Sequence, residues 1–162
     1  MKQVQVSGTH WAMVDDADHA VVASHTWRLR TGGKNRYAAT TIDGREVLMH
    51  RLVMDATKGT VVDHIDGDGL HNQRKNLRFC TRAENFRNAG HRQTRGRTSR
   101  YKGVWRIKES CRRCWRAGIT ANRVYRNIGS YWTEEDAARA YDDAAKVLHA
   151  QFARLNFPTT VP

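Results

Sequence analysis

The sequence is poor in acidic residues, cysteine and proline, and it has no long hydrophobic run. Only 16 of its 162 residues are Asp or Glu, against 28 Lys or Arg, so the formal net charge is +12. An excess of this size indicates a polyanionic partner, which is most often nucleic acid. No apolar run approaches the roughly 18 residues of a membrane-spanning helix, and the first residues lack the apolar core of a signal peptide. We therefore expect an intracellular, soluble protein that binds nucleic acid and no membrane.

The three cysteines, Cys80, Cys111 and Cys114, exclude a disulfide framework because their number is odd and the expected compartment is reducing. Cys111 and Cys114 form a CxxC pair, which could belong to a zinc site or to an exposed turn. A structural zinc site needs four ligands, with a second pair roughly 12 residues further on. No such pair follows, which favours an exposed turn.

The first 50 residues are typical of a β-rich region. Two short runs flank Gly32-Gly33-Lys34-Asn35, and Asp43-Gly44 predicts a hairpin with a type I′ turn. Residues 49–58 predict a short helix with Gly59 just past its end.

Residues 60–88 predict a strand, a turn-rich loop, a second strand and a helix. The helix should begin near Arg82, because Thr81 and Glu84 form a capping box. Residues 89–99 are too poor in apolar side chains to form a core and are expected to be a linker. Its arginines, with no acidic counterpart, suggest a tether that lies along phosphates.

Residues 100–158 contain three strand-like runs and then a helix that begins after Thr133. The chain is thus expected to be α+β. Its predicted divisions are a β-rich region that includes the strand–loop–strand–helix unit at 1–88, a basic linker at 89–99, and a three-stranded antiparallel sheet with one helix at 100–158.

The segment "VVDHIDGDGLHNQRKNLRFCTRAENFRN", residues 61–88, carries the candidate chemistry. Phosphodiester hydrolysis needs a base for the attacking water and a cation for the developing charge. Asp63 and Asn85 offer the oxygen ligands that Mg²⁺ prefers, His64 suits the base, and Asn76 is placed to tie the loop. A DH pair in a turn can equally be structural. A calcium loop fits less well because the acidic residues do not have the spacing of such a loop. A zinc cluster fits less well because it would need more His or Cys ligands than the segment offers.

With "HRLVM" before it, this segment resembles the HNH endonucleases of the phage and intron homing type. The resemblance implies double-stranded DNA as the partner and a ββα-metal site in which Asp63 and Asn85 bind a divalent ion, Mg²⁺ by preference with Mn²⁺ as the substitute. It makes His64 the general base and Asn76 the brace of the loop. The family's third histidine is an asparagine here, which favours a hard metal.

Residues 100–158 resemble the AP2/ERF DNA-binding domain through "YKGV", "IGSYWTEEDAARAYDDAA" and "LNFP". That resemblance implies a sheet laid in the major groove with a helix behind it, but the family's base-reading residues are replaced. The predicted DNA contacts are Arg92, Arg95, Arg97, Arg100, Lys102, Arg106, Arg116, Thr120, Arg123, Tyr125 and Asn127.

Two functions are therefore compatible with the sequence. The first is a site-specific, metal-dependent HNH endonuclease that the AP2-like region directs to its target. The second is an AP2-type DNA-binding regulator with an inactive HNH unit. One site per chain predicts a nick by a monomer or a double-strand break by a homodimer. The target sequence and the roles of Cys111 and Cys114 do not follow from the sequence.

Overall fold

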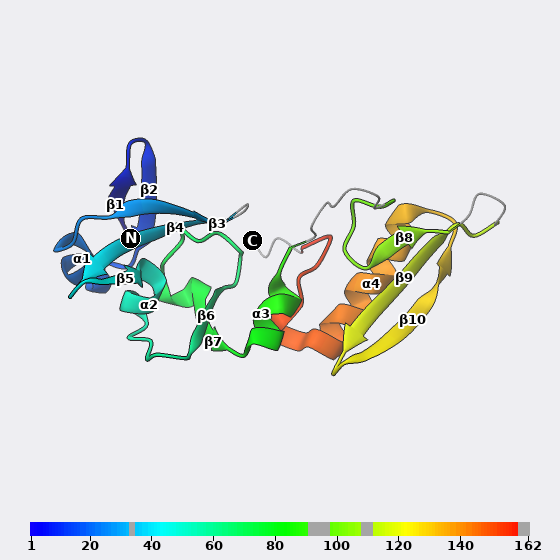
Figure 1. Ribbon diagram of the computed structural model, residues 1–162. Coiled ribbons are helices and arrows are strands. Elements are labelled where there is room, and N and C mark those ends of the chain that lie inside the picture. The colour runs from blue at the N-terminus through cyan, green and yellow to red at the C-terminus, as the bar shows by residue number, and fades with distance from the viewer. Residues whose placement is uncertain (33–34, 91–97, 108–111, 159–162) are drawn as a thin grey trace. The chain divides into compact units, whose positions relative to one another are not determined.

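The computed structural model describes residues 1–32, 35–90, 98–107 and 112–158, and the chain divides into two compact units, Met1–Asn85 and Phe86–Pro162 (Figure 1). Both contain small antiparallel sheets and few helices, which agrees with the predicted α+β class. Among the described residues, no helix has the length and apolar character required to cross a membrane.

The first unit begins with a hairpin of β1 (Lys2–Ser7) and β2 (His10–Val14). Alternate residues of both strands, including Val4 and Val14, are buried in the core of the unit. Helix α1 (Asp16–Ala23) follows, and it was not predicted. Its buried residues are only Asp18 and Val22, so it lacks the apolar periodicity by which a sequence indicates a helix.

Three antiparallel strands come next: β3 (Arg28–Gly32), β4 (Asn35–Ile42) and β5 (Arg45–Leu48). Asp43 and Gly44 both have positive φ, as the predicted type I′ turn requires. Helix α2 (Met49–Val53) is shorter than predicted, and Gly59 does not end it. The chain turns at Asp55, which has a φ of 47°, and Gly59 belongs to the connection to the next strand.

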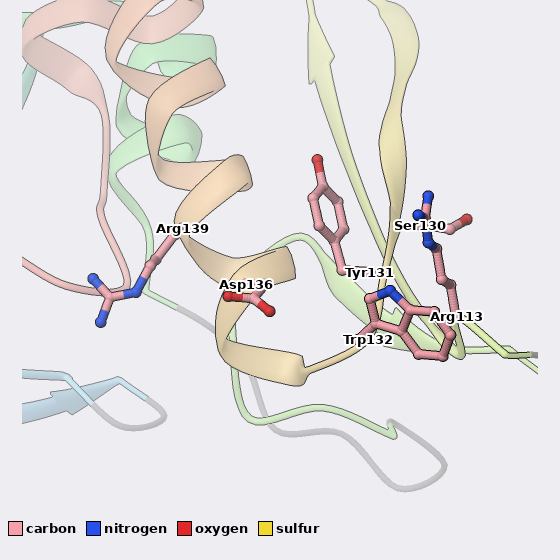
Figure 2. A pocket seen from close by; sticks show the side chains of 6 residues that line it. All are labelled: Arg113, Ser130, Tyr131, Trp132, Asp136 and Arg139. Atoms are coloured by element: carbon pink, nitrogen blue, oxygen red, sulfur yellow. The ribbon is translucent and has the colours of Figure 1, made fainter.

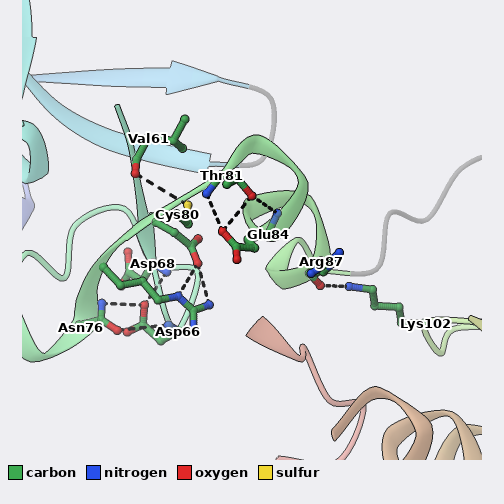
Figure 3. A network of polar contacts seen from close by, with 11 residues as sticks. Val61, Asp66, Asp68, Asn76, Cys80, Thr81, Glu84, Arg87 and Lys102 are labelled. Carbon is green, nitrogen blue, oxygen red and sulfur yellow. Dashed lines mark hydrogen bonds and ion pairs between the residues drawn. The ribbon is translucent and has the colours of Figure 1, made fainter. Parts of the chain in front are cut away.

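The predicted strand, loop, strand and helix are confirmed as β6 (Val61–His64), the 3-10 turn η1 (Arg74–Asn76), β7 (Leu77–Cys80) and α3 (Arg82–Asn88). Figure 3 shows the capping box that starts α3. The Thr81 backbone N–H donates to Glu84 Oε2 at 2.7 Å, and the Glu84 N–H donates to Thr81 Oγ1 at 3.2 Å. These bonds satisfy backbone donors that the first turn of a helix leaves unpaired.

The second unit contains a three-stranded antiparallel sheet in the order β10-β9-β8, with β8 (Val104–Arg106), β9 (Trp115–Ala121) and β10 (Val124–Tyr131). Helix α4 (Glu134–His149) packs against one face of the sheet, and the short turn η2 (Ala150–Phe152) follows (Figure 1). Thr133 caps α4 as predicted, accepting from the Asp136 N–H at 3.0 Å. Ala117 and Ile119 are buried beneath the helix, so the other face of the sheet is open.

Asn156 closes this unit by binding the segment before β8. Its Oδ1 accepts from the Lys102 N–H at 2.7 Å, and its Nδ2 donates to the Lys102 carbonyl at 3.1 Å. The buried Asp142 of α4 accepts from the backbone N–H groups of Asn156 and Phe157, each at 2.8 Å. Next to Lys102, Gly103 has a φ of 73° and lies directly against the ring of Tyr141.

Candidate active site

The loop between β6 and β7 is held closed by Asn76 (Figure 3). Asn76 Oδ1 accepts from the Asp66 N–H at 3.1 Å, while its Nδ2 donates to Asp66 Oδ1 at 2.9 Å and to the His71 carbonyl at 2.8 Å. Burial raises the pKa of Asp66, but hydrogen bonds from Asp68, Asn76 and His71 outweigh it, and the net pKa is lowered. Asn76 thus makes the kind of backbone contact that a bracing residue needs.

His64, the last residue of β6, is buried at 5% exposure in a polar cluster. Its Nε2 lies 3.1 Å from Oδ1 of Asn72, which is fully buried. Because that oxygen can only accept, the proton of a neutral His64 belongs on Nε2 and Nδ1 is the basic nitrogen. Burial lowers the pKa of His64, only partly opposed by the bond to Asn72, so the imidazole is neutral at physiological pH.

A second histidine stands behind the first. The ring of His50, from α2, meets that of His64 edge to face with centroids 4.8 Å apart, and Tyr37 contacts both rings. Burial, followed by the nearby His64, lowers the pKa of His50 to about 3. His50 is therefore a neutral packing partner that fixes the plane of the His64 ring.

Asp63 lies on the opposite face of β6 from His64, because neighbouring strand residues alternate. The register pairs Asp63 with Arg78 and His64 with Leu77. Arg78 Nη2 donates to Asp63 Oδ2 at 2.7 Å and Nε donates to the same oxygen at 3.0 Å, with both side chains largely buried. The strand ends at His64, and the Gly67 N–H bonds the His64 carbonyl in the turn that follows. Asp63 and His64 thus approach the end of β6 from its two faces.

Cys80 connects Asp63 to the start of α3. It shares a strand face with Arg78, and burial raises the pKa of its thiol, as does the nearby carboxylate of Asp63. A hydrogen bond with the backbone of Asn85 acts in the opposite direction. Asp63 and the exposed Asn85 therefore both lie close to Cys80, on the side of the unit where β7 leads into α3.

The donor chemistry of Asp63 and Asn85 fits a hard divalent cation, since a carboxylate and an amide oxygen are ligands that Mg²⁺ accepts while it keeps places for water and phosphate. Among the described residues, no group of three or more His, Cys, Asp or Glu could hold a metal ion. A thiolate and imidazole cage of the zinc type is therefore absent from this part of the chain. Cys114 is half-buried, and Cys111 lies outside the described residues.

Of the predicted DNA contacts in and next to the linker, the structure describes only Arg100. Arg92, Arg95 and Arg97 lie outside the described residues. Arg100 donates to Tyr101 Oη and to Glu135 Oε1, at 2.9 and 3.0 Å.

Lys102 and Arg106 do not lie on the open face. Lys102 Nζ donates to the carbonyls of Arg87 and Ala89, and burial lowers its pKa to about 8. Arg106 pairs with Trp115 and stacks on its ring at 6.0 Å, which places it on the helix side of the sheet. Lys102 precedes β8, which begins only at Val104, so strand alternation does not determine where its side chain points.

Four predicted contacts do share the open face of the sheet. Thr120 pairs with Tyr125 and Asn127 pairs with Gly118 in the register of β9 and β10, and Arg116 pairs with Trp105 of β8. All project away from α4. The rings of Trp105 and Tyr125 meet over Gly118, where a Cβ would lie 2.5 Å from Tyr125 Oη. Arg123 lies in the turn between the two strands, with a φ of 65°.

Sequence reasoning missed three residues of the site: His50, Asn72 and Arg78. His50 belongs to the quoted "HRLVM", but nothing in the spacing shows that this helix reaches His64. Asn72 lies in the quoted loop among several polar residues, and nothing in the sequence distinguishes it from them. Arg78 could have been found, because in an antiparallel pair of strands the residue opposite a buried carboxylate is often its partner.

We expect His50 to make stability depend on pH. Because the pKa of His50 is depressed in the folded state, the unfolded chain binds a proton that the folded chain does not, and stability is lost as pH falls from about 6.5 towards 3. Between pH 7 and pH 4.5 the free energy of unfolding should fall in both proteins. The fall should be smaller in His50→Phe than in wild type, by on the order of 2 kcal/mol. Urea unfolding at both pH values measures this. His19→Phe, on α1, controls for loss of a histidine, and equal losses in wild type and His50→Phe would contradict the prediction.

Comparison with known proteins agrees with the geometry of the first unit. A family described as HNH endonuclease matches residues 47–87, which include α2 and the whole ββα segment up to Arg87. No solved structure matches the chain significantly.

Two relatives come from viruses. Protein 3.8 of Escherichia phage T7 is 37% identical over 97 residues, which cover 60% of this chain and 76% of that protein. An uncharacterized HNH endonuclease of Acanthamoeba polyphaga mimivirus is 30% identical over 142 residues, which cover 84% of this chain and 69% of that protein. With the buried imidazole, the carboxylate and the distal amide arranged on one ββα segment, the match identifies the chain as a member of the HNH endonuclease family.

Proposed function

We propose that this nuclease is a site-specific, homing-type DNA endonuclease that depends on a divalent metal ion, most readily Mg²⁺. The observation that carries the proposal is the neutral imidazole of His64, whose Nε2 is bound by Asn72, at the end of the strand that also carries Asp63. A neutral buried imidazole with a basic Nδ1 suits a general base for water. His64 would take the proton of the attacking water.

Asp63 and Asn85 would hold the metal ion, and the ion would supply positive charge for the phosphate in the transition state. Arg78 orients the Asp63 carboxylate through its two bonds to Oδ2. Asn76 keeps the loop closed around Asp66 and thereby fixes the path of the backbone after His64. These roles for Asp63, His64, Asn76 and Asn85 are the ones that the sequence predicts.

The second unit would bring the enzyme to its target, as an AP2-like DNA-binding domain at residues 100–158 joined through a basic linker at 89–99. Its open face carries Arg116, Thr120, Tyr125 and Asn127, with no acidic residue among the strand residues that share that face. A sheet face that carries an arginine, hydrogen-bonding side chains and no carboxylate suits the major groove. Specific interfaces bury on the order of 1,000–2,500 Å² of protein surface, so the second unit would add contact area that a small nuclease unit lacks.

The test is cleavage of supercoiled plasmid and phage DNA by the purified chain, with Mg²⁺ or Mn²⁺ and with EDTA. We expect cutting at a small number of mapped positions that EDTA abolishes and added Mg²⁺ restores. Nicked circles indicate a monomer acting alone, and linear product indicates two chains acting together. If the chain binds DNA but cuts none with either metal, it is a DNA-binding regulator with an inactive HNH unit.

A further inference from the structure

A hollow opens at the end of β10 and the start of α4, outside the open face of the sheet (Figure 2). It has a volume of about 480 Å³ and is lined by Arg113, Ser130, Tyr131, Trp132, Asp136 and Arg139. Neither the nuclease chemistry nor the predicted groove contacts use any of these residues. The lining combines an exposed aromatic ring, a cation, a hydroxyl and a carboxylate in one place.

Trp132 is the principal surface of the hollow. Its indole is 59% exposed, which is unusual for a tryptophan of a small unit that has little core to spare. The guanidinium of Arg113 lies over the ring at 5.7 Å from its centroid. A cation on one side of an indole holds the ring in place while another flat group stacks on it.

The remaining polar groups of the hollow favour a nucleobase over a phosphate as its ligand. The guanidinium of Arg139 lies over the ring of Phe157 at 4.8 Å, and Figure 2 shows it directed away from Trp132. Arg113 is therefore the cation at the indole, and the carboxylate of Asp136 repels a phosphate. The pairing edge of every nucleobase carries at least one N–H donor, for which a carboxylate is a good acceptor, and only an unpaired base exposes that edge.

From this arrangement we propose that the hollow binds an unpaired nucleobase of single-stranded DNA, stacked on Trp132 and hydrogen-bonded to Asp136. The proposal rests on the proposed function, which brings DNA to the second unit. Ser130 links the two surfaces: it lines the hollow and pairs with Arg116, which lies on the open face. A strand that leaves the open face at this end therefore meets the hollow next.

The test is binding of a fluorescein-labelled single strand of about 12 nucleotides, within the usual range for single-strand sites, and of the matched blunt duplex, by the full chain with EDTA present. Trp132→Ala should weaken single-strand binding about tenfold, since stacking contributes roughly 1–3 kcal/mol per base, and should leave duplex binding unchanged. Trp132→Phe should restore most of the affinity. Asp136→Asn, which keeps an acceptor and adds a donor, should weaken single-strand binding less than Trp132→Ala.

Trp11→Ala is the matched control, because Trp11 is also exposed, at 48%, but belongs to β2 in the first unit. Its single-strand affinity should equal that of wild type. The inference is overturned if Trp132→Ala binds the single strand normally, if it weakens single strand and duplex equally, or if Trp11→Ala has the same effect. Plasmid cleavage by the wild-type chain is measured in parallel, so that failure of the nuclease proposal is seen separately.

Discussion

Replacing His64 with alanine is expected to reduce DNA cleavage about a thousandfold, which is the middle of the range that a general base contributes. The imidazole is the neutral base of the proposed site, and alanine offers no group that can accept a proton from water in its place. DNA affinity should remain near that of wild type, because His64 is buried and the predicted DNA contacts lie elsewhere. Plasmid cleavage with Mg²⁺, and fluorescence anisotropy with EDTA, measure the two properties.

Two further variants separate chemistry from folding. His64→Gln fills more of the space than alanine and can still bond Asn72, so it should keep the wild-type melting temperature more closely while remaining inactive. His19→Ala removes a histidine from α1 and should cut normally. A His64→Gln protein that cuts DNA at the wild-type rate would show that another group is the base.

Replacing Gly103 with alanine is expected to unfold the second unit or to lower its melting temperature by more than about 10 °C. A Cβ at this position would lie 2.0 Å from the Tyr141 ring and 2.9 Å from the Gly118 carbonyl, and the φ of 73° is strained for any residue with a side chain. Tyr141 is buried at 3% exposure between the helix and the sheet, so it has little room to move. Strain and overpacking together cost about 3 kcal/mol or more.

Tryptophan fluorescence during thermal unfolding detects this loss, because Trp105, Trp115 and Trp132 all belong to the second unit. Gly90→Ala is the matched control, since a Cβ there meets no atom within 4 Å. Wild-type melting of Gly103→Ala would mean that the packing of the segment before β8 against α4 is wrong. DNA cleavage by Gly103→Ala should lose its sequence preference if the second unit selects the target.

The elements that were predicted correctly depend on neighbours in the chain. The Thr81–Glu84 capping box, the Thr133 cap and the Asp43-Gly44 turn all involve residues no more than three positions apart, and all three are observed. Helix α1 was missed because its stability comes from contacts that are distant in sequence. Asp18, for example, pairs with Arg74, which lies 56 residues away.

In the site, too, contacts between sequence neighbours were predictable and contacts between distant residues were not. The sequence indicates His64 by its neighbours, but the groups that surround its imidazole come from α2, β4 and the loop after β6. Strand alternation places Arg116 and Thr120 correctly, because β9 is long and regular. It fails for Lys102, which precedes a strand of only three residues and bonds backbone carbonyls instead of facing DNA.

The contact between Asn156 and Lys102 constrains the order in which the protein can mature on the ribosome. Fifty-four positions separate the two residues, so the segment that leads into β8 waits for its partner until synthesis has passed Asn156. The strand pairs β1–β2 and β6–β7 each join residues that lie within the first unit. A nascent chain can therefore form these strand pairs of its first unit before the segment that leads into β8 finds its partner in the second.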